Sequence, residues 1–80
     1  MALKFKYKLT KEGERRCVKD EFYLQDFTPG YTEKIFRLLN KSDEPLTSIE
    51  ISERTGIRTR TVNGVITFNI YAGYIKRLFI

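Results

Sequence analysis

The sequence contains no histidine and no tryptophan, and only one cysteine and two prolines among its 80 residues. Without histidine there is no Cys/His metal set and no histidine-based acid, base or triad catalysis. The single cysteine, Cys17, has no second cysteine with which to form an internal disulfide. These absences close the commonest routes to an active site, so we expect no catalytic residues, no bound metal and no cofactor.

Long apolar runs are also lacking. The N-terminus alternates apolar and charged side chains instead of carrying the apolar core of a signal peptide, and no stretch is long enough to span a membrane. We therefore expect a cytoplasmic protein in a reducing compartment, with no membrane partner. With 41% hydrophobic and 14% aromatic residues the chain has enough apolar surface to fold, and its length supports one domain over residues 1–80.

The formal net charge of +5 is unevenly distributed along the chain. Residues 1–20 hold seven basic and three acidic side chains, whereas residues 21–53 hold three basic and seven acidic ones. From residue 54 onward there are five basic side chains and no acidic one. A basic surface built from the two ends of the chain suits a polyanionic partner. The same charges would also keep a small domain soluble, and charge by itself favours neither interpretation.

The first part of the chain predicts a strand followed by a helix. Between Leu3 and Leu9 apolar residues alternate with lysines, which is the period of a half-buried strand. Thr10 is a typical helix N-cap, so we expect a helix from Lys11 to about Phe22. Gly13 lies in the first turn of that helix and weakens its propensity.

A second helix is predicted after the sequence Thr28-Pro29-Gly30. Thr28 can cap it, and Pro29 has the backbone angle that suits the first helical position. Apolar residues then recur at helical spacing until the turn-rich stretch 40–45. They are Tyr31, Ile35, Leu38 and Leu39.

A third, short helix is predicted by a capping box. Thr47 and Glu50 have the spacing at which a threonine hydroxyl and a glutamate carboxylate satisfy each other's backbone N–H groups. Gly56 favours the left-handed conformation that ends a helix, so we expect this one to stop near Thr55.

A longer helix and a final strand are predicted next. Ile57 is expected to point back to the core, and a helix is expected over Thr59–Tyr71. Gly73 ends that helix, and residues 74–80 are rich in strand formers.

Three pieces of this region resemble the winged helix-turn-helix family of DNA-binding domains, as found in small prokaryotic, archaeal or viral regulators. The pieces are Leu46-Thr47-x-x-Glu50-Ile51, Thr55-Gly56-Ile57-x-x-x-Thr61-Val62-x-x-x-Ile66 and Gly73-Tyr74-Ile75. The resemblance implies an α+β fold with three to four helices and a small antiparallel sheet. It also implies that the partner is double-stranded DNA.

The family's wing is rearranged in this sequence. Family members usually follow Gly-Tyr-Ile with a strand, a loop and a return strand that ends in Tyr-x-Leu-Thr-x-x-Gly. Here the pattern Tyr7-x-Leu9-Thr10-x-x-Gly13 stands at the front of the chain. We therefore predict that the N-terminal strand pairs antiparallel with residues 74–80, and that the wing loop is missing.

The resemblance implies that the helix over residues 59–71 lies in the major groove. Its apolar residues, expected to face the core, are Val62, Val65, Ile66 and Ile70. The residues on or near this helix that are expected to contact DNA are Arg54, Arg58, Thr59, Arg60, Thr61, Asn63 and Thr67. Arginine can bond guanine, asparagine can bond adenine, and threonine can bond a phosphate or touch a thymine methyl group. The plainer alternative is a solvated helix face.

The two terminal strands supply a second candidate surface. Its residues are Lys4, Lys6, Lys8, Lys76 and Arg77. They are expected to form one basic sheet face that contacts phosphates without specifying sequence. Alternating lysines also protect an edge strand from aggregation, and both interpretations stay open.

Some residues depart from the family pattern or fit more than one role. Gly64 suits either a close approach to DNA or tight packing against another helix. Asn69 stands where the family usually has a large apolar residue, a role that Ile70 can take. Phe68 is left on the exposed side, which is typical of a partner contact. Cys17 is expected to pack as a small apolar residue, and a redox role would need a lowered pKa.

The predicted function is sequence-dependent binding of double-stranded DNA by a small transcriptional regulator. The alternative is a winged-helix adaptor that binds protein. An enzyme is a distant third, because no nucleophile with an adjacent base is visible, and no small-molecule substrate is expected. The aromatic cluster Phe22, Tyr23, Leu24 and Phe27 either covers the core or forms a homodimer interface, and dimerisation would present two recognition helices to successive grooves.

Overall fold

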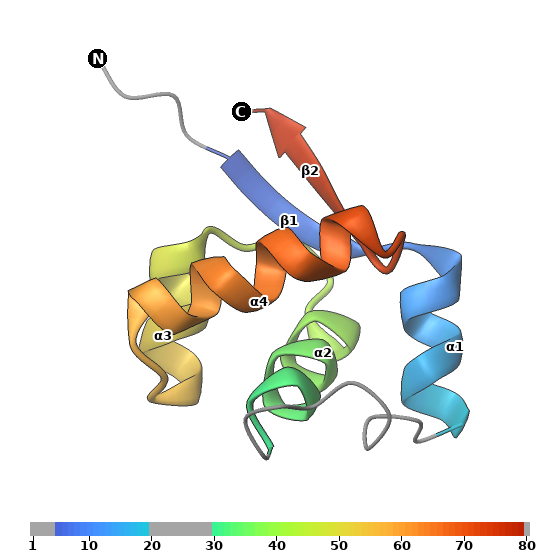
Figure 1. Cartoon of the computed structure of the whole chain (residues 1–80), viewed down its shortest axis with the longest axis horizontal. Helices are drawn as coiled ribbons and strands as arrows, with labels where there is room; N and C mark the ends of the chain where they lie inside the picture. The colour runs from blue at the N-terminus through green and yellow to red at the C-terminus, as the bar shows by residue number, and fades with distance from the viewer. Residues whose placement is uncertain (1–4, 20–29, 80) are drawn as a thin grey trace.

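The computed structural model describes residues 5–19 and 30–79. In chain order they form strand β1 (Phe5–Leu9), helices α1 (Lys11–Lys19), α2 (Tyr31–Lys41), α3 (Ser48–Thr55) and α4 (Thr59–Tyr71), and strand β2 (Ile75–Phe79). Helix α4 spans the molecule from α3 at one end to α1 at the other, with α2 below it (Figure 1). The described part of the chain is therefore an α+β fold, as predicted.

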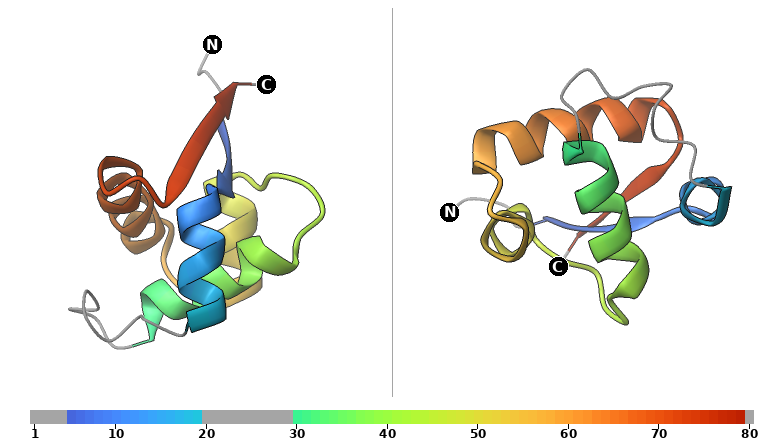
Figure 2. Two further views of the ribbon diagram at one scale, coloured as in Figure 1. Left: turned by 90° about the vertical axis from the view of Figure 1, so that its right-hand side faces the viewer. Right: turned by 90° about the horizontal axis from the view of Figure 1, so that it is seen from below.

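The first and last elements of the chain pair as an antiparallel two-stranded sheet. Phe5 lies opposite Phe79 at one end of the register, and Leu9 lies opposite Ile75 at the other. The two strands lie side by side and extend away from α1 and α2, toward the top of the left view in Figure 2. The other edge of β1 exchanges two backbone hydrogen bonds between Tyr7 and Leu46, at 2.8 and 3.1 Å. The predicted pairing of the two terminal strands is confirmed.

Helix α1 begins where the chain leaves β1, and it is attached to the turn between α4 and β2. The Thr10 hydroxyl donates to the Gly73 carbonyl at 2.6 Å and accepts from the Gly13 N–H at 3.2 Å. The Thr10 N–H donates to the Tyr74 carbonyl at 2.9 Å. A Cβ on Gly13 would collide with that same carbonyl oxygen and lie 3.1 Å from the Leu9 side chain. The glycine that weakens the helix prediction is thus required by a close backbone approach.

Residues 20–29, which connect α1 and α2 in the sequence, lie outside the described residues, and several predictions concern them. Helix α1 is described as far as Lys19, and its predicted continuation to Phe22 lies outside the described residues. So do the predicted cap Thr28, the predicted first helical residue Pro29, and the aromatic cluster of residues 22–27. The described helix α2 begins at Tyr31, after Gly30 in the left-handed region at φ 84°.

Helix α2 supplies the centre of the core. Ile35 and Phe36 are completely buried and Leu39 is nearly so, while Tyr31 and Leu38 pack against the core from its margin. The four apolar positions predicted from helical spacing are confirmed. Phe36 was not among them, although it is the largest fully buried side chain of the described core.

Helices α3 and α4 and the turn between them follow the prediction closely. The Thr47 hydroxyl accepts from the Glu50 N–H at 3.1 Å, and the Glu50 carboxylate accepts from the Thr47 N–H at 2.9 Å. These hydrogen bonds lower the pKa of the Glu50 carboxyl. Gly56 ends α3 in the left-handed region at φ 76°. The turn is then held by a 2.5 Å bond from the Ser52 hydroxyl to the carbonyl of buried Ile57.

The predicted core residues Val62, Val65, Ile66 and Ile70 all lie in or against the core, but one further residue was missed. Asn69, expected to yield its place to Ile70, is itself 2% exposed, whereas Ile70 is only partly buried. The helical period explains this, because Asn69 lies three residues after buried Ile66 and so falls on the same face. Its amide nitrogen donates to the Val65 carbonyl at 2.8 Å, while its side-chain oxygen has no hydrogen-bond partner.

One residue of α1, Arg16, differs from its expected role, whereas Cys17 matches it. Arg16, which belongs to the basic N-terminal charge cluster, is 5% exposed, and its guanidinium lies 4.6 Å from the Tyr74 ring centroid and 5.4 Å from that of Phe36. Its guanidinium lies beside aromatic rings in the interior, so it is not part of the exposed basic surface. Cys17 is buried as predicted, and burial raises the pKa of its thiol despite nearby Arg37 and Arg16. The redox role that required a lowered pKa is therefore contradicted.

None of the helices within residues 5–19 and 30–79 is long and apolar enough to cross a membrane.

Replacing Gly13 should destabilise the fold. We expect Gly13→Ala to lower the free energy of unfolding by about 1–3 kcal/mol, because the added methyl group collides with the Tyr74 carbonyl. Urea denaturation followed by circular dichroism measures the effect. Gly64→Ala is the matched control, since a Cβ there meets no atom within 4 Å and should stabilise α4 by about 1 kcal/mol. Equal effects of the two substitutions would contradict the close approach at Gly13.

Replacing Asn69 should have the opposite effect. Leucine has nearly the same branched shape, and it removes the buried oxygen that has no hydrogen-bond partner. We expect Asn69→Leu to raise the free energy of unfolding by about 1–2 kcal/mol, measured by urea denaturation. Asn69→Asp, which keeps the shape but places a charge in the core, should instead be strongly destabilising. A loss of stability in the leucine variant would show that the asparagine oxygen is satisfied.

Candidate nucleic-acid interface

The outward face of α4 carries a row of polar side chains. Arg60, Asn63, Thr67 and Tyr71 recur at the spacing of one helical face, and all four are exposed. The opposite face of the helix buries Val62 and Ile66 in the core, so the exposed row cannot turn inward without unfolding the helix. We call Arg60, Asn63, Thr67 and Tyr71 the α4 row.

The other predicted residues of this helix lie beside the α4 row. Arg58 and Thr59 are exposed at the start of the helix. Thr61 is half-buried, and since successive helical residues are turned by about 100°, it lies to one side of Arg60. Tyr71 was not predicted although it is 88% exposed, and extending the spacing from Arg60 by three turns would have found it.

The beginning of α4 has no side-chain cap, and neither does that of α2, whereas α1 and α3 each have one. Thr47 and Glu50 cap α3, and Thr10 accepts from Gly13 in α1. In contrast, Arg58 occupies the N-cap position of α4 without a side-chain hydrogen bond, and no acidic residue lies in the first turn. The first backbone N–H groups of a helix carry partial positive charge and suit an anion such as phosphate. Arg58 and Arg60 add full positive charges to the same end.

At Gly64 the exposed face of α4 has no side chain, so the helix backbone is accessible there. The glycine is exposed, and a Cβ at this position would meet no atom within 4 Å among the described residues. The alternative that Gly64 permits tight packing against another helix of the described fold is therefore excluded. A glycine inside a helix costs about 1 kcal/mol relative to alanine, and the described contacts of this chain give no compensation.

The prediction that the terminal strands form one basic face is wrong, because the described basic side chains project from both faces of the sheet. Residues directly opposite in an antiparallel pair share a face, and Lys8 lies opposite Lys76 while Arg77 lies opposite buried Tyr7. Since side chains alternate along a strand, Lys6 shares the outward face with Lys8 and Lys76, and Arg77 projects from the other face. Lys4 lies outside the described residues.

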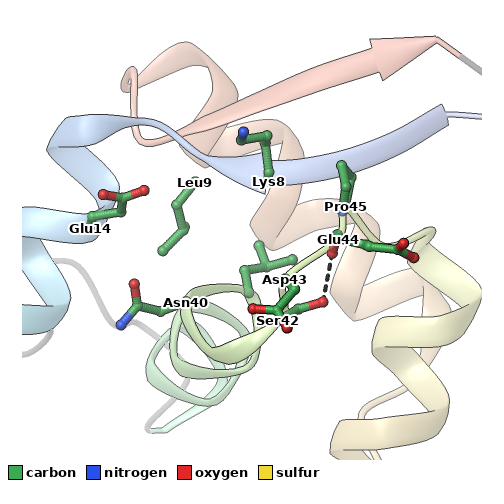
Figure 3. Close-up of a pocket in the computed structure, with 9 residues that line it drawn as sticks. Lys8, Leu9, Glu14, Asn40, Ser42, Asp43, Glu44 and Pro45 are labelled. Carbon is green, nitrogen blue, oxygen red and sulfur yellow. Dashed lines mark hydrogen bonds between the residues drawn. The ribbon is translucent and has the colours of Figure 1, made fainter.

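The outward face of the sheet also has acidic neighbours. Lys8 borders a hollow beneath β1 that Glu14, Asp43 and Glu44 also line (Figure 3). The Ser42 hydroxyl donates to the Glu44 carbonyl at 2.6 Å and holds the turn there. Carboxylates so close to the lysine face reduce its attraction for a polyanion.

Arg77 instead joins the end of the α4 row. Together with Thr67, Ile70 and Tyr71 it lines a shallow pocket between α4 and β2. Its guanidinium lies 4.7 Å from the centroid of the Phe5 ring, which is 5.1 Å from that of Phe79. The aromatic ring under the guanidinium supports the charge in a defined position beside the helix. The tertiary structure thus brings together Arg60, Asn63, Thr67 and Arg77 from the predicted set.

Arg54 belongs to a different surface. It lies near the end of α3 and lines a groove with Lys34, Arg37 and Lys41 of α2. The sequence placed it beside the 59–71 helix because only three residues separate it from Arg58. Its helical position turns it toward α2 instead.

The described residues contain no group of three or more His, Cys, Asp or Glu side chains that could hold a metal ion. The exposed surface of α4 and β2 presents cationic, amide, hydroxyl and aromatic groups. Comparison of the chain with family models, with curated proteins and with solved structures gives no match.

Proposed function

We propose that this chain is a winged helix-turn-helix protein that binds double-stranded DNA in a sequence-dependent manner, as a small transcriptional regulator. The observation that carries the proposal is the exposed face of α4, which combines arginine, asparagine and threonine with an uncapped helix start and no acidic side chain. A helix of this width fits the major groove, where these side-chain types distinguish base pairs.

Each part of the surface has a distinct role in this proposal. Arg60 and Asn63 contact base edges, since they lie in the first two turns of α4, where such helices meet the bases. Arg58 and the free N–H groups of the helix start bind a phosphate. Arg77 binds a second phosphate beside the last turn of α4 and replaces part of the missing wing.

A protein-binding adaptor remains the second candidate, and exposed aromatic residues favour it. Tyr71 is 88%, Phe79 75% and Phe68 49% exposed, which is unusual for large apolar side chains of a small domain. A homodimer would use the same residues. The two functions differ in their need for Arg58 and Arg60, which an adaptor surface does not require.

Removing the two arginines should strongly weaken DNA binding. We expect Arg58→Ala/Arg60→Ala to weaken binding to a random-sequence duplex pool by about tenfold or more, with a shallower salt dependence. Fluorescence anisotropy at two salt concentrations measures this, and selection from the pool identifies an enriched site.

The matched control removes two charges from the outward face of the sheet. Lys8→Gln/Lys76→Gln lowers the net charge equally but leaves α4 and Arg77 unchanged. We expect a loss of affinity of less than about threefold, from the long-range charge alone. Equal losses in the two variants would mean that only net charge matters, and no binding by the wild type at low salt would refute the DNA proposal.

Gly64→Ala separates stability from binding. The substitution should stabilise α4 by about 1 kcal/mol, yet its methyl group should weaken duplex binding severalfold if DNA approaches the helix backbone there. Urea denaturation and anisotropy on the same sample measure both quantities. Unchanged affinity for the selected site would contradict a close approach at Gly64.

A further inference from the structure

A second basic surface lies on α2 and α3, and the proposed DNA contacts do not use it. A groove with a volume of about 390 Å³ runs between these helices. Its lining residues are Lys34, Arg37, Leu38 and Lys41 of α2, and Arg54 and Thr55 of α3. Both helices lie away from β2, which supports Arg77 at the other end of α4 (Figure 1).

The groove concentrates positive charge, and nearby acidic groups offset only part of it. Lys34, Lys41 and Arg54 are exposed, and none of them has an ion pair with the residues that the structure describes. Arg37 is bound to Glu33 at 2.8 Å, so one of the four cations has an acidic partner within α2. Like charges that converge on one groove repel each other, and an anion bound between them relieves that repulsion.

The lining of the groove indicates what kind of anion fits. Leu38 is half-buried and offers apolar surface between Lys34 and Lys41, which lie one turn before it and one turn after it. The Thr55 hydroxyl donates to the Ile51 carbonyl at 2.7 Å, so its proton is used within α3. The groove is shallow, so its chemistry decides the choice: apolar Leu38 between the cations favours a peptide that carries both carboxylates and an apolar side chain, which a phosphate backbone lacks.

We propose that this groove is a docking site for an acidic protein segment in which an apolar residue stands between carboxylates. The carboxylates pair with Lys34, Lys41 and Arg54, and the apolar side chain covers Leu38. Such pairing gives charge specificity and a salt-dependent affinity. The site is independent of the α4 row, so a partner protein and DNA can be bound at the same time.

A labelled peptide tests the proposal directly. The probe is a short fluorescein-labelled peptide of sequence Glu-Glu-Leu-Glu-Glu-Leu-Glu-Glu, and the comparison peptides replace either Glu by Gln or Leu by Ser. We expect the probe to bind the full chain more tightly than both comparison peptides in anisotropy titrations. Amide chemical-shift changes should concentrate at residues 34–41 and 54–55.

Paired variants then assign the binding to the groove. Lys34→Gln/Lys41→Gln should weaken peptide binding about fivefold or more, because each lost ion pair contributes a modest amount. Lys8→Gln/Lys76→Gln removes the same charge elsewhere and should leave peptide binding nearly unchanged. Duplex binding of the groove variant should stay close to that of the wild type.

Several results would overturn the proposal. These are no peptide binding, equal losses in the two variants, shift changes centred on α4, or equal binding of the peptide without leucine. A duplex affinity reduced by the groove variant as strongly as by Arg58→Ala/Arg60→Ala would reassign the groove to DNA phosphates. Failure of the wild type to bind any duplex would refute the DNA proposal alone and leave this one intact.

Discussion

The docking of Thr10 and Gly13 against the turn between α4 and β2 is the interaction on which the arrangement of this molecule depends. The Thr10 side chain and backbone hold the carbonyls of Gly73 and Tyr74, and the absence of a side chain on Gly13 lets the two segments approach. This contact joins the beginning of α1 to the turn after α4. It thereby aligns β1 with β2. The position of Arg77 beside α4 follows from that alignment.

The two basic surfaces of the molecule carry charge of the same sign but differ in shape and in the groups that lie between the cations. The α4 row stands on a convex helix with a low point at Gly64 and an uncapped start. The surface between α2 and α3 is a shallow groove that Leu38 lines with apolar surface. The net charge of +5 does not locate either surface, because basic residues elsewhere also contribute to it. Arg16 is buried against aromatic rings, and Lys8 lies near carboxylates.

Helix α4 departs from the ordinary rules of helix stability at several positions, while α3 follows them. Helix α3 has a capping box and ends at a left-handed glycine. Helix α4 has no side-chain cap and contains Gly64 and the buried Asn69, each of which costs stability. Departures of this kind concentrate at functional sites. Gly64 and the missing cap agree with the proposed DNA contact, but α2 also begins without a side-chain cap, and nothing in the structure explains Asn69.

Local patterns in the sequence were sufficient to predict the elements, whereas the pairing of the two terminal strands was predicted from the resemblance to winged helix-turn-helix domains. The capping box, Gly56 and the helical spacing of apolar residues depend on neighbours within a few positions, so α3 and α4 begin and end where expected. Only the tertiary structure decided which side chains share a surface. Strand register placed Arg77 on the face opposite to the lysines, and helix packing buried Arg16 and turned Arg54 toward α2. Those outcomes depend on residues far apart in the chain, whose contacts no local pattern specifies.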